Sequence, residues 1–156
     1  MYKATNELIK NRDKFSQYPI KQVLVERRGG GIVNDCFKNA INTIDESAGV
    51  SVVSGWLVWR YDAVSNKTVI NQHFWNADKK GGYFDTTPLP NEAFEYVIDM
   101  ALAIYGQENH EKIRSSVCYS LVYSDGDYIA CEEIDGRAIQ HKIENLSHLN
   151  IFKFKE

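Results

Sequence analysis

Three segments of the chain space their apolar residues three and four positions apart, as the buried face of a helix requires. They cover residues 4–16, a stretch that starts at Asn34 or Asp35 and runs to about Ser47, and residues 92–105. The second segment has good N-cap residues at its start and a glycine, Gly49, just beyond its end. We therefore expect three helices.

Runs rich in β-branched and aromatic residues lie between and after these segments. They predict strands at residues 20–25, 50–61, 68–77, 83–86, 116–123 and 128–134, with a final strand at 150–154 after an ambiguous stretch. Asp125-Gly126, between the fifth and sixth runs, supplies the positive φ that a tight hairpin turn needs. The pattern predicts an α+β fold in which the helix near residue 36 packs on a central antiparallel sheet.

The chain has 156 residues, of which 44% are apolar and 25% charged, as in an ordinary soluble domain. We expect one domain over residues 1–156, with its core at 32–90 and an extension at 91–156. A net charge of −3 argues against nucleic-acid binding, and no apolar run approaches the ~20 residues that cross a bilayer. The N-terminal residues lack the apolar stretch of a signal peptide, and the three cysteines form no Cys-x-x-Cys pair, which favours the cytoplasm.

Three residues of the core carry candidate chemistry. Cys36 begins the second predicted helix, where unpaired backbone N–H groups favour a thiolate. His73 lies in the strand at 68–77, and an imidazole within reach of a thiol can take its proton. Asp85 lies one hairpin further on, and a carboxylate bonded to the far ring nitrogen would orient the imidazole and support its charge. Each residue alone has a structural interpretation, but the order Cys, His, Asp on helix start, strand and next strand predicts one site.

These residues occur in motifs that resemble the transglutaminase-like branch of the papain-like thiol enzymes. The motifs are Asn34-Asp35-Cys36-Phe37-Lys38-Asn39-Ala40, Val53-Ser54-Gly55-Trp56, His73-Phe74-Trp75 and Tyr83-Phe84-Asp85-Thr86-Thr87-Pro88. The Cys-Phe-x-Asn-Ala start is also similar to small uncharacterised bacterial and phage proteins. The resemblance covers about residues 32–90. It implies a papain-like core with Cys36 as nucleophile, His73 as base, Asp85 as the orienting acid and Trp75 in the wall of the site.

The sequence offers several candidates for the hydrogen-bond donor that would stabilise a tetrahedral oxyanion. Papain-like enzymes keep a glutamine shortly before the cysteine, and this chain has three glycines and Ile32 there instead. The backbone N–H of Cys36 together with Asn34, Asn71 or Gln72 is the expected substitute.

Two further core residues have open roles. Asn39 lies one turn after Cys36 and either hydrogen-bonds buried backbone or touches a ligand. Aromatic residues make up 12% of the chain, and all three tryptophans, Trp56, Trp59 and Trp75, fall on the two central predicted strands. These aromatic residues are therefore expected to wall one site. Trp56 is counted among the candidate substrate contacts.

The sequence leaves two main functions open. The first is thiol-dependent acyl transfer or amide and peptide hydrolysis, acting on a protein, a peptide or a small amide or acyl substrate without a metal or organic cofactor. The second is an inactive binding protein of the same fold, a phage or bacterial accessory protein that holds a ligand or a host protein in an aromatic groove. A subunit that self-associates through its aromatic residues, as a homo-oligomer, is a third interpretation.

Other features favour structural roles. His110, His141 and His148 have no further ligands at metal-binding spacing, so no metal site is expected. Cys118 and Cys131 lie on the two arms of the predicted hairpin and are expected to be buried packing residues. The run Arg27-Arg28-Gly29-Gly30-Gly31 is either an anion site or, more simply, a connecting loop.

Overall fold

The fold was analysed in a computed structural model that describes residues 2–14, 18–62, 67–102, 120–134 and 136–143. The end of the third expected helix beyond Leu102, the strand expected at 150–154, Cys118, His110 and His148 lie outside the described residues. Within them, no helix is long and apolar enough to span a membrane.

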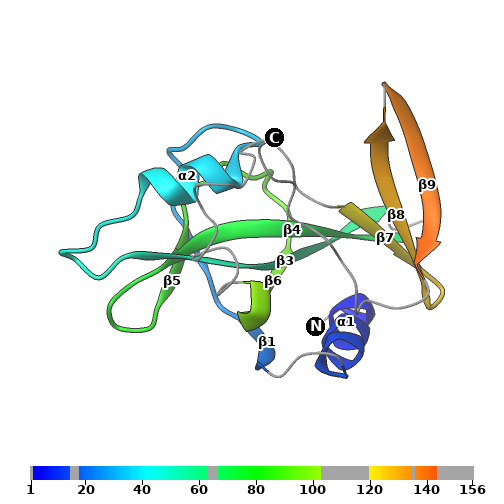
Figure 1. Ribbon diagram of the computed structural model, residues 1–156, viewed down its shortest axis with the longest axis horizontal. Helices are drawn as coiled ribbons and strands as arrows, with labels where there is room; N and C mark the ends of the chain where they lie inside the picture. The colour runs from blue at the N-terminus through cyan, green and yellow to red at the C-terminus, as the bar shows by residue number, and fades with distance from the viewer. Residues whose placement is uncertain (1, 15–17, 63–66, 103–119, 135, 144–156) are drawn as a thin grey trace.

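Nine described strands form one open sheet (Figure 1). Its main path runs β1-β6-β3-β4-β7-β8-β9, and β5 and β2 extend it beside β4. Eight strands are joined by antiparallel pairs, whereas β2 joins parallel to β5. The strands are β1 (Ile20–Val23), β2 (Glu26–Arg27), β3 (Ser51–Asp62), β4 (Lys67–Ala77), β5 (Tyr83–Asp85), β6 (Phe94–Asp99), β7 (Ser120–Ser124), β8 (Asp127–Ile134) and β9 (Arg137–Ile143).

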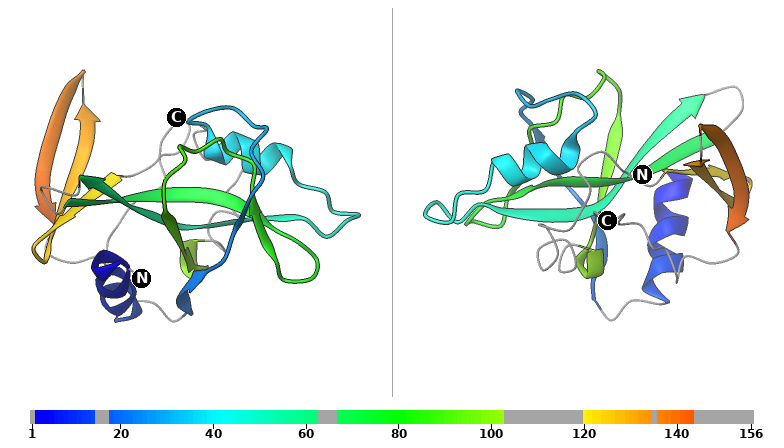
Figure 2. Two further views of the ribbon diagram at one scale, coloured as in Figure 1. Left: turned by 180° about the vertical axis from the view of Figure 1, so that it is seen from behind. Right: turned by 45° about the horizontal axis from the view of Figure 1, so that its top comes forward.

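Two helices pack against this sheet, α1 (Lys3–Asp13) and α2 (Cys36–Asn42). Figure 2 shows α2 over the part of the sheet near β5, and α1 at the other end, near β7 and β8. The expected α+β class, with a helix on a central antiparallel sheet, is therefore confirmed.

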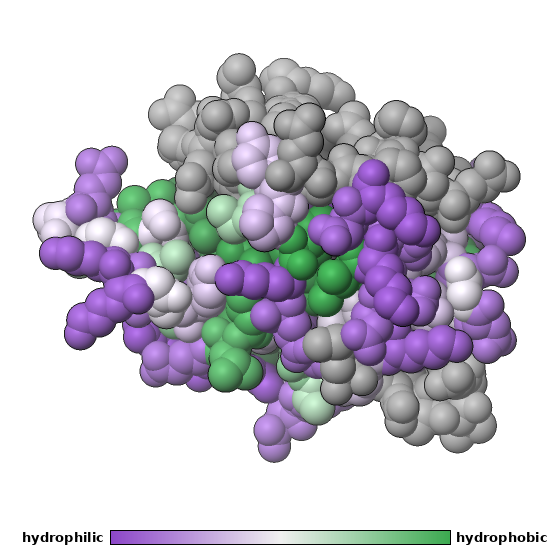
Figure 3. All heavy atoms as spheres, turned by 90° about the horizontal axis from the view of Figure 1, so that it is seen from below, coloured by the Kyte–Doolittle hydropathy of each residue, from purple (hydrophilic) through white to green (hydrophobic). Residues whose placement is uncertain are grey.

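Alternating side chains of β3 and β4 divide the core into two apolar clusters. The first contains Trp56 and Phe74 and includes residues of both helices, whereas the second contains Leu57 and Trp75. The period of two along each strand separates the clusters onto the two faces of the sheet. Seen from below, hydrophobic residues gather near the middle of the molecule, and hydrophilic residues lie to the left and right of them (Figure 3).

The expected helix at 92–105 is wrong over most of its length. Residues Phe94–Asp99 form β6, and helical backbone begins only at Met100. Because β6 lies between β1 and β3, its side chains are buried on both faces of the sheet. A strand buried on both faces reads as a continuous apolar run, and such a run also satisfies helical spacing.

The second expected helix begins as predicted but ends early, at Asn42 rather than near Ser47. Asp45 ends it by forming a local turn, because its Oδ1 accepts hydrogen bonds from the Ser47 hydroxyl and the Ala48 backbone N–H. At the start of the helix, Asp35 occupies the N-cap position, but its side chain makes no capping hydrogen bond.

The expected hairpin is confirmed. Asp125 and Gly126 both have positive φ, 49° and 91°, and they join β7 to β8. The ambiguous stretch after this hairpin contains a strand, β9, which pairs with β8 along its whole length.

Candidate active site

His73 and Asp85 form a buried pair at the junction of β4 and β5. Nε2 of His73 lies 2.7 Å from Oδ2 of Asp85, and the two residues are only 5% and 1% exposed. A tight turn joins the two strands, in which Oδ1 of Asp78 accepts hydrogen bonds from the backbone N–H groups of Lys80 and Gly82. The hairpin that the sequence predicts therefore brings the two side chains together.

Further hydrogen bonds fix the carboxylate of Asp85. Its Oδ1 accepts a hydrogen bond from the backbone N–H of Thr87 at 2.8 Å, and its Oδ2 accepts one from the hydroxyl of Tyr96 at 2.8 Å. Burial alone would raise the pKa of Asp85, but the hydrogen bond and charge of His73, with the bonds from Thr87 and Tyr96, lower it. Asp85 is therefore an ionised acceptor held from three sides.

Cys36 is the first residue of α2, and a hydrogen bond joins its side chain to His73. Because Asp85 occupies Nε2 of the imidazole, Nδ1 is the ring nitrogen left for the sulfur. Burial alone would lower the pKa of His73, but the charge of Cys36 and the hydrogen bonds to Asp85 and Cys36 raise it to about 10. This arrangement favours a thiolate and imidazolium pair, in which the imidazole has the two partners that a catalytic thiol site needs.

The position of Cys36 follows from how α2 lies on β4. The Asn76 side-chain amide donates to the backbone carbonyl of Ala40 at 2.9 Å, and the ring of Phe37 packs edge-on against Phe74 at 4.9 Å. On that edge of β4, β7 pairs only as far as Asn71 and β5 pairs only with residues 76–77. Residues 72–75 pair with β3 on their other edge, but on this edge they have no partner among the described strands. The start of α2 reaches His73 at this gap.

Aromatic side chains pack around the imidazole on the second apolar face. The ring of Trp75 is stacked with His73 at 6.2 Å between centroids, and Tyr96 packs edge-on against both rings. Trp75 is fully buried, so it lies beside His73 without forming an open wall.

Trp56 is not brought to His73. It belongs to the first apolar cluster, on the opposite face of the sheet, and its indole N–H donates to Asp99 at 3.2 Å. The same carboxylate accepts a hydrogen bond from Nε of Arg12 at 2.9 Å, and this bond connects α1 to β6. Trp56 is therefore part of a buried structural network.

The four amide candidates differ in their positions and contacts. Asn71 lies on β4 between Leu57 of β3 and Ser120 of β7. Asn39 uses its side chain on protein partners: its Oδ1 accepts the N–H of Ile32 at 2.8 Å, and its Nδ2 donates to the carbonyl of Ile32 and the hydroxyl of Thr87. Asn34 is exposed and has a positive φ of 60°. Gln72 is wholly buried on β4 beside His73.

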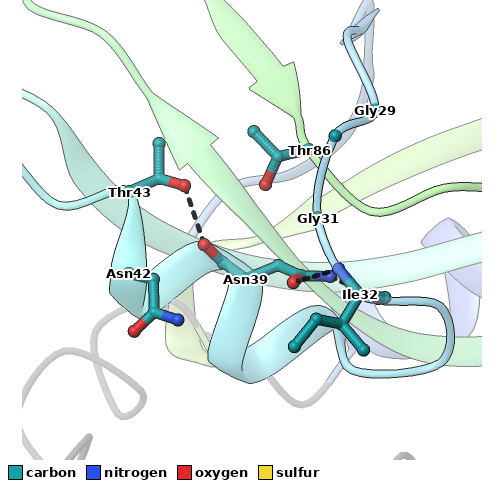
Figure 4. Close-up of a pocket in the computed structure, with 8 residues that line it drawn as sticks. Gly29, Gly31, Ile32, Asn39, Asn42, Thr43 and Thr86 are labelled. Carbon is teal, nitrogen blue, oxygen red and sulfur yellow. Dashed lines mark hydrogen bonds between the residues drawn. The ribbon is translucent and has the colours of Figure 1, made fainter.

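The glycine-rich run forms one wall of an open cleft (Figure 4). Hydrogen bonds from Arg28 and Gly31 to the backbone carbonyls of Asp85 and Thr86 hold this run against the end of β5. The cleft between the run and α2 has a volume of about 430 Å³. Its lining is uncharged and consists of Gly29, Gly30, Gly31, Ile32, Asn39, Asn42, Thr43 and Thr86.

The two arginines of this run have protein partners. Arg27 donates to the carbonyl of Pro90 at 2.6 Å and lies over the ring of Phe94. Arg28 pairs with Glu26 at 2.9 Å and lies over Phe84. These contacts favour the loop interpretation over the anion site. Among the described residues there is also no group of His, Cys, Asp and Glu arranged to hold a metal.

Sequence reasoning missed the parts of the site that depend on distant pairing. Tyr96 lies in the segment expected to be a helix, and the cleft depends on the glycine run packing beside β5. One local pattern in the sequence pointed toward the cleft, the run of three glycines that ends at Gly31. A Cβ at Gly31 would lie 2.6 Å from Cγ of Asn39, so only glycine fits there.

Comparison with models of protein families, with curated proteins and with solved structures found no match.

Proposed function

We propose that this chain is a thiol-dependent enzyme of acyl transfer or amide hydrolysis, with a core like that of the transglutaminase-like thiol enzymes. The observation that carries the proposal is the buried chain of contacts from Cys36 through His73 to Asp85. A histidine held between a thiol and a carboxylate is the arrangement that activates a cysteine nucleophile.

The reaction follows from the protonation of the pair. His73 holds the proton of Cys36 at Nδ1, and Asp85 stabilises the imidazolium through Nε2. The thiolate attacks the carbonyl carbon of the substrate, and the carbonyl oxygen takes up the negative charge. When this intermediate collapses, the leaving amine takes the proton from His73 and a thioester remains on Cys36. Water or a second amine then releases the acyl group and regenerates the thiol.

The cleft beside α2 is where we expect part of the substrate to lie. Asn39, which lines the cleft, and Cys36 are three residues apart on the helix, so their Cβ atoms lie roughly 5–6 Å from each other. Its uncharged lining of backbone, amide and hydroxyl groups suits a peptide or other amide segment.

One observation favours the second candidate, an inactive binding protein of the same fold. Cys36 is only 5% exposed, so a carbonyl carbon has little access to the sulfur in this conformation. An aromatic groove, however, gains no wall from Trp56 or Trp75, because both are fully buried.

The pH dependence of Cys36 alkylation separates the two candidates. Iodoacetamide labelling is followed at each pH by mass spectrometry of the Cys36 peptide, with the urea-unfolded chain as the free-thiol reference. A free thiol with a pKa of about 8.5 is roughly 0.3% thiolate at pH 6. A paired thiolate is fully formed there but is intrinsically less nucleophilic, so we expect about a tenfold faster reaction. His73→Ala should remove this advantage.

Ser54→Ala is the matched control. The hydroxyl of Ser54, on β3, donates to the backbone carbonyl of His73, so this change removes a contact to the backbone of His73 and leaves the imidazole in place. We expect the pH profile to stay that of the wild type. If Cys36 in the native protein reacts like the unfolded chain, or does not react at all, the enzyme proposal is wrong.

A further inference from the structure

Gln72 is a buried polar side chain that the Cys-His-Asp arrangement does not use. It is fully buried, and within the part of the chain that the structure describes neither Oε1 nor Nε2 has a hydrogen-bond partner. Leaving a buried donor or acceptor unsatisfied costs about 1–3 kcal/mol. Native proteins contain few such groups, and a catalytic role is one of the reasons for which they are kept.

The register of α2 on β4 places Gln72 toward the start of the helix. Ala40 of the helix meets Asn76, and Phe37 meets Phe74, so the helix runs in the same direction as the strand. The next residue of β4 on that face, in the direction of the helix start, is Gln72. It lies opposite Trp56 of β3, in the apolar layer to which Cys36 belongs.

The N–H donors of the other buried amides near the site are already used, although Oδ1 of Asn76 has no partner among the described residues. Both polar atoms of the Asn39 side chain bond to protein partners, and Nδ2 of Asn76 donates to the carbonyls of Ala40 and Ser51. The indole N–H of Trp75 is also without a partner among the described residues, but Trp75 belongs to the second apolar cluster, whereas Cys36 belongs to the first, with Trp56 opposite Gln72. Among the described residues, Gln72 is therefore the buried amide donor that is unused and lies in the apolar layer of Cys36.

We propose that Nε2 of Gln72 donates a hydrogen bond to the oxyanion that forms when Cys36 attacks an acyl carbon. The inference rests on the proposed function and adds its missing donor. On attack, the S–C bond forms and the carbonyl π electrons move to oxygen, where the Gln72 N–H meets the new charge. On collapse the C=O bond reforms and the leaving group departs. Because the amide has no partner among the described residues of the resting protein, the bond is gained only as charge develops, which is the condition for lowering the barrier.

Two reactions of the same thiol test this role. Acylation by p-nitrophenyl acetate passes through a tetrahedral oxyanion, whereas alkylation by iodoacetamide displaces iodide at a saturated carbon and forms none. Both are measured on the full chain, and the modified Cys36 peptide is quantified by mass spectrometry. Gln72→Met keeps the length of the side chain and removes the amide, and Gln72→Ala is the second variant in case methionine does not fit. Ile70→Leu, two residues earlier on the same buried face, is the matched packing control.

We expect the Gln72 variants to alkylate within about twofold of the wild type but to acylate about 10²-fold more slowly, as for loss of one oxyanion donor. Ile70→Leu should change neither rate. Equal acylation of wild type and a folded Gln72 variant would overturn the inference, as would a parallel loss of both reactions or failure of both variants to fold. A wild-type Cys36 that neither acylates nor alkylates at low pH would instead overturn the proposed function itself.

Discussion

Asn39→Ala tests how the glycine-rich run is held to α2. The side chain of Asn39 makes three hydrogen bonds, two with the backbone of Ile32 at 2.8 and 2.7 Å and one with the hydroxyl of Thr87 at 3.2 Å. Because Asn39 is buried, water does not replace these bonds when the side chain is removed. At about 1 kcal/mol each they contribute about 3 kcal/mol, and the better helix propensity of alanine returns about 0.5 kcal/mol. The expected loss is about 2–3 kcal/mol.

Urea unfolding followed by tryptophan fluorescence measures this loss. With a slope of about 2 kcal/mol per molar urea, the midpoint of unfolding should fall by about 1 M. Asn42→Ala is the matched control, because Asn42 lies three residues further along the same helix and is exposed. Its free energy of unfolding should change by less than about 0.5 kcal/mol.

The comparison has a clear negative result. If the two variants unfold at the same urea concentration, Asn39 does not hold the glycine run, and the cleft wall has another cause. If Asn39→Ala unfolds at a lower urea concentration but its free energy of unfolding also depends less steeply on urea, the native state itself has become less compact. The loss then cannot be assigned to the three hydrogen bonds.

Two further predictions concern the charged pairs in the core. The ring protons of His73 should titrate near pH 10 in NMR spectra, and the midpoint should fall in Asp85→Asn; an ordinary midpoint of about 6.5 in the wild type would contradict the pairing. Since the pKa is raised on folding, the contribution of His73 to the free energy of unfolding is complete below about pH 6.5 and is lost as the pH rises toward 10. Arg12→Met should cost about 3–5 kcal/mol in urea unfolding, because it leaves the buried Asp99 carboxyl without its cation. The ion pair of Lys10 with Glu7 is exposed and provides the contrast. If Lys10→Met lowered the free energy of unfolding as much as Arg12→Met, burial would not be what makes the Arg12 pair important.

The sequence predicts the elements whose cause is local. The hairpins of β4 with β5 and of β7 with β8 follow from turn residues next to apolar runs, and the start of α2 follows from its amphipathic spacing. The helix expected at 92–105 fails because the partners of β6 are distant: β1 lies about 75 residues earlier in the chain and β3 about 40. Only those pairings distinguish a strand buried on both faces from a helix.

The candidate site divides in the same way. His73 and Asp85 lie across one hairpin, and only β3 separates this hairpin from the helix with Cys36, so their proximity can be anticipated from the sequence. Tyr96 reaches Asp85 only because β6 pairs with β3, and that register in turn needs Gly55, where a Cβ would lie 2.0 Å from the carbonyl oxygen of Val97. A glycine within a strand is only a weak indication that another strand passes close to it. Neither the bond from Tyr96 to Asp85 nor the close approach of Gly55 to Val97 could therefore be derived before the sheet was known.

The end of β5 shows why the fold and the site are one arrangement. If β5 continued past Asp85, its next residues would pair with residues 72–75 of β4 and fill the gap where α2 begins. The strand stops because Oδ1 of Asp85 accepts the N–H of Thr87, which turns the chain away before Pro88. The other oxygen of the same carboxylate bonds to His73. One aspartate thus ends the strand, opens the edge of β4 to Cys36 and orients the imidazole that faces the thiol.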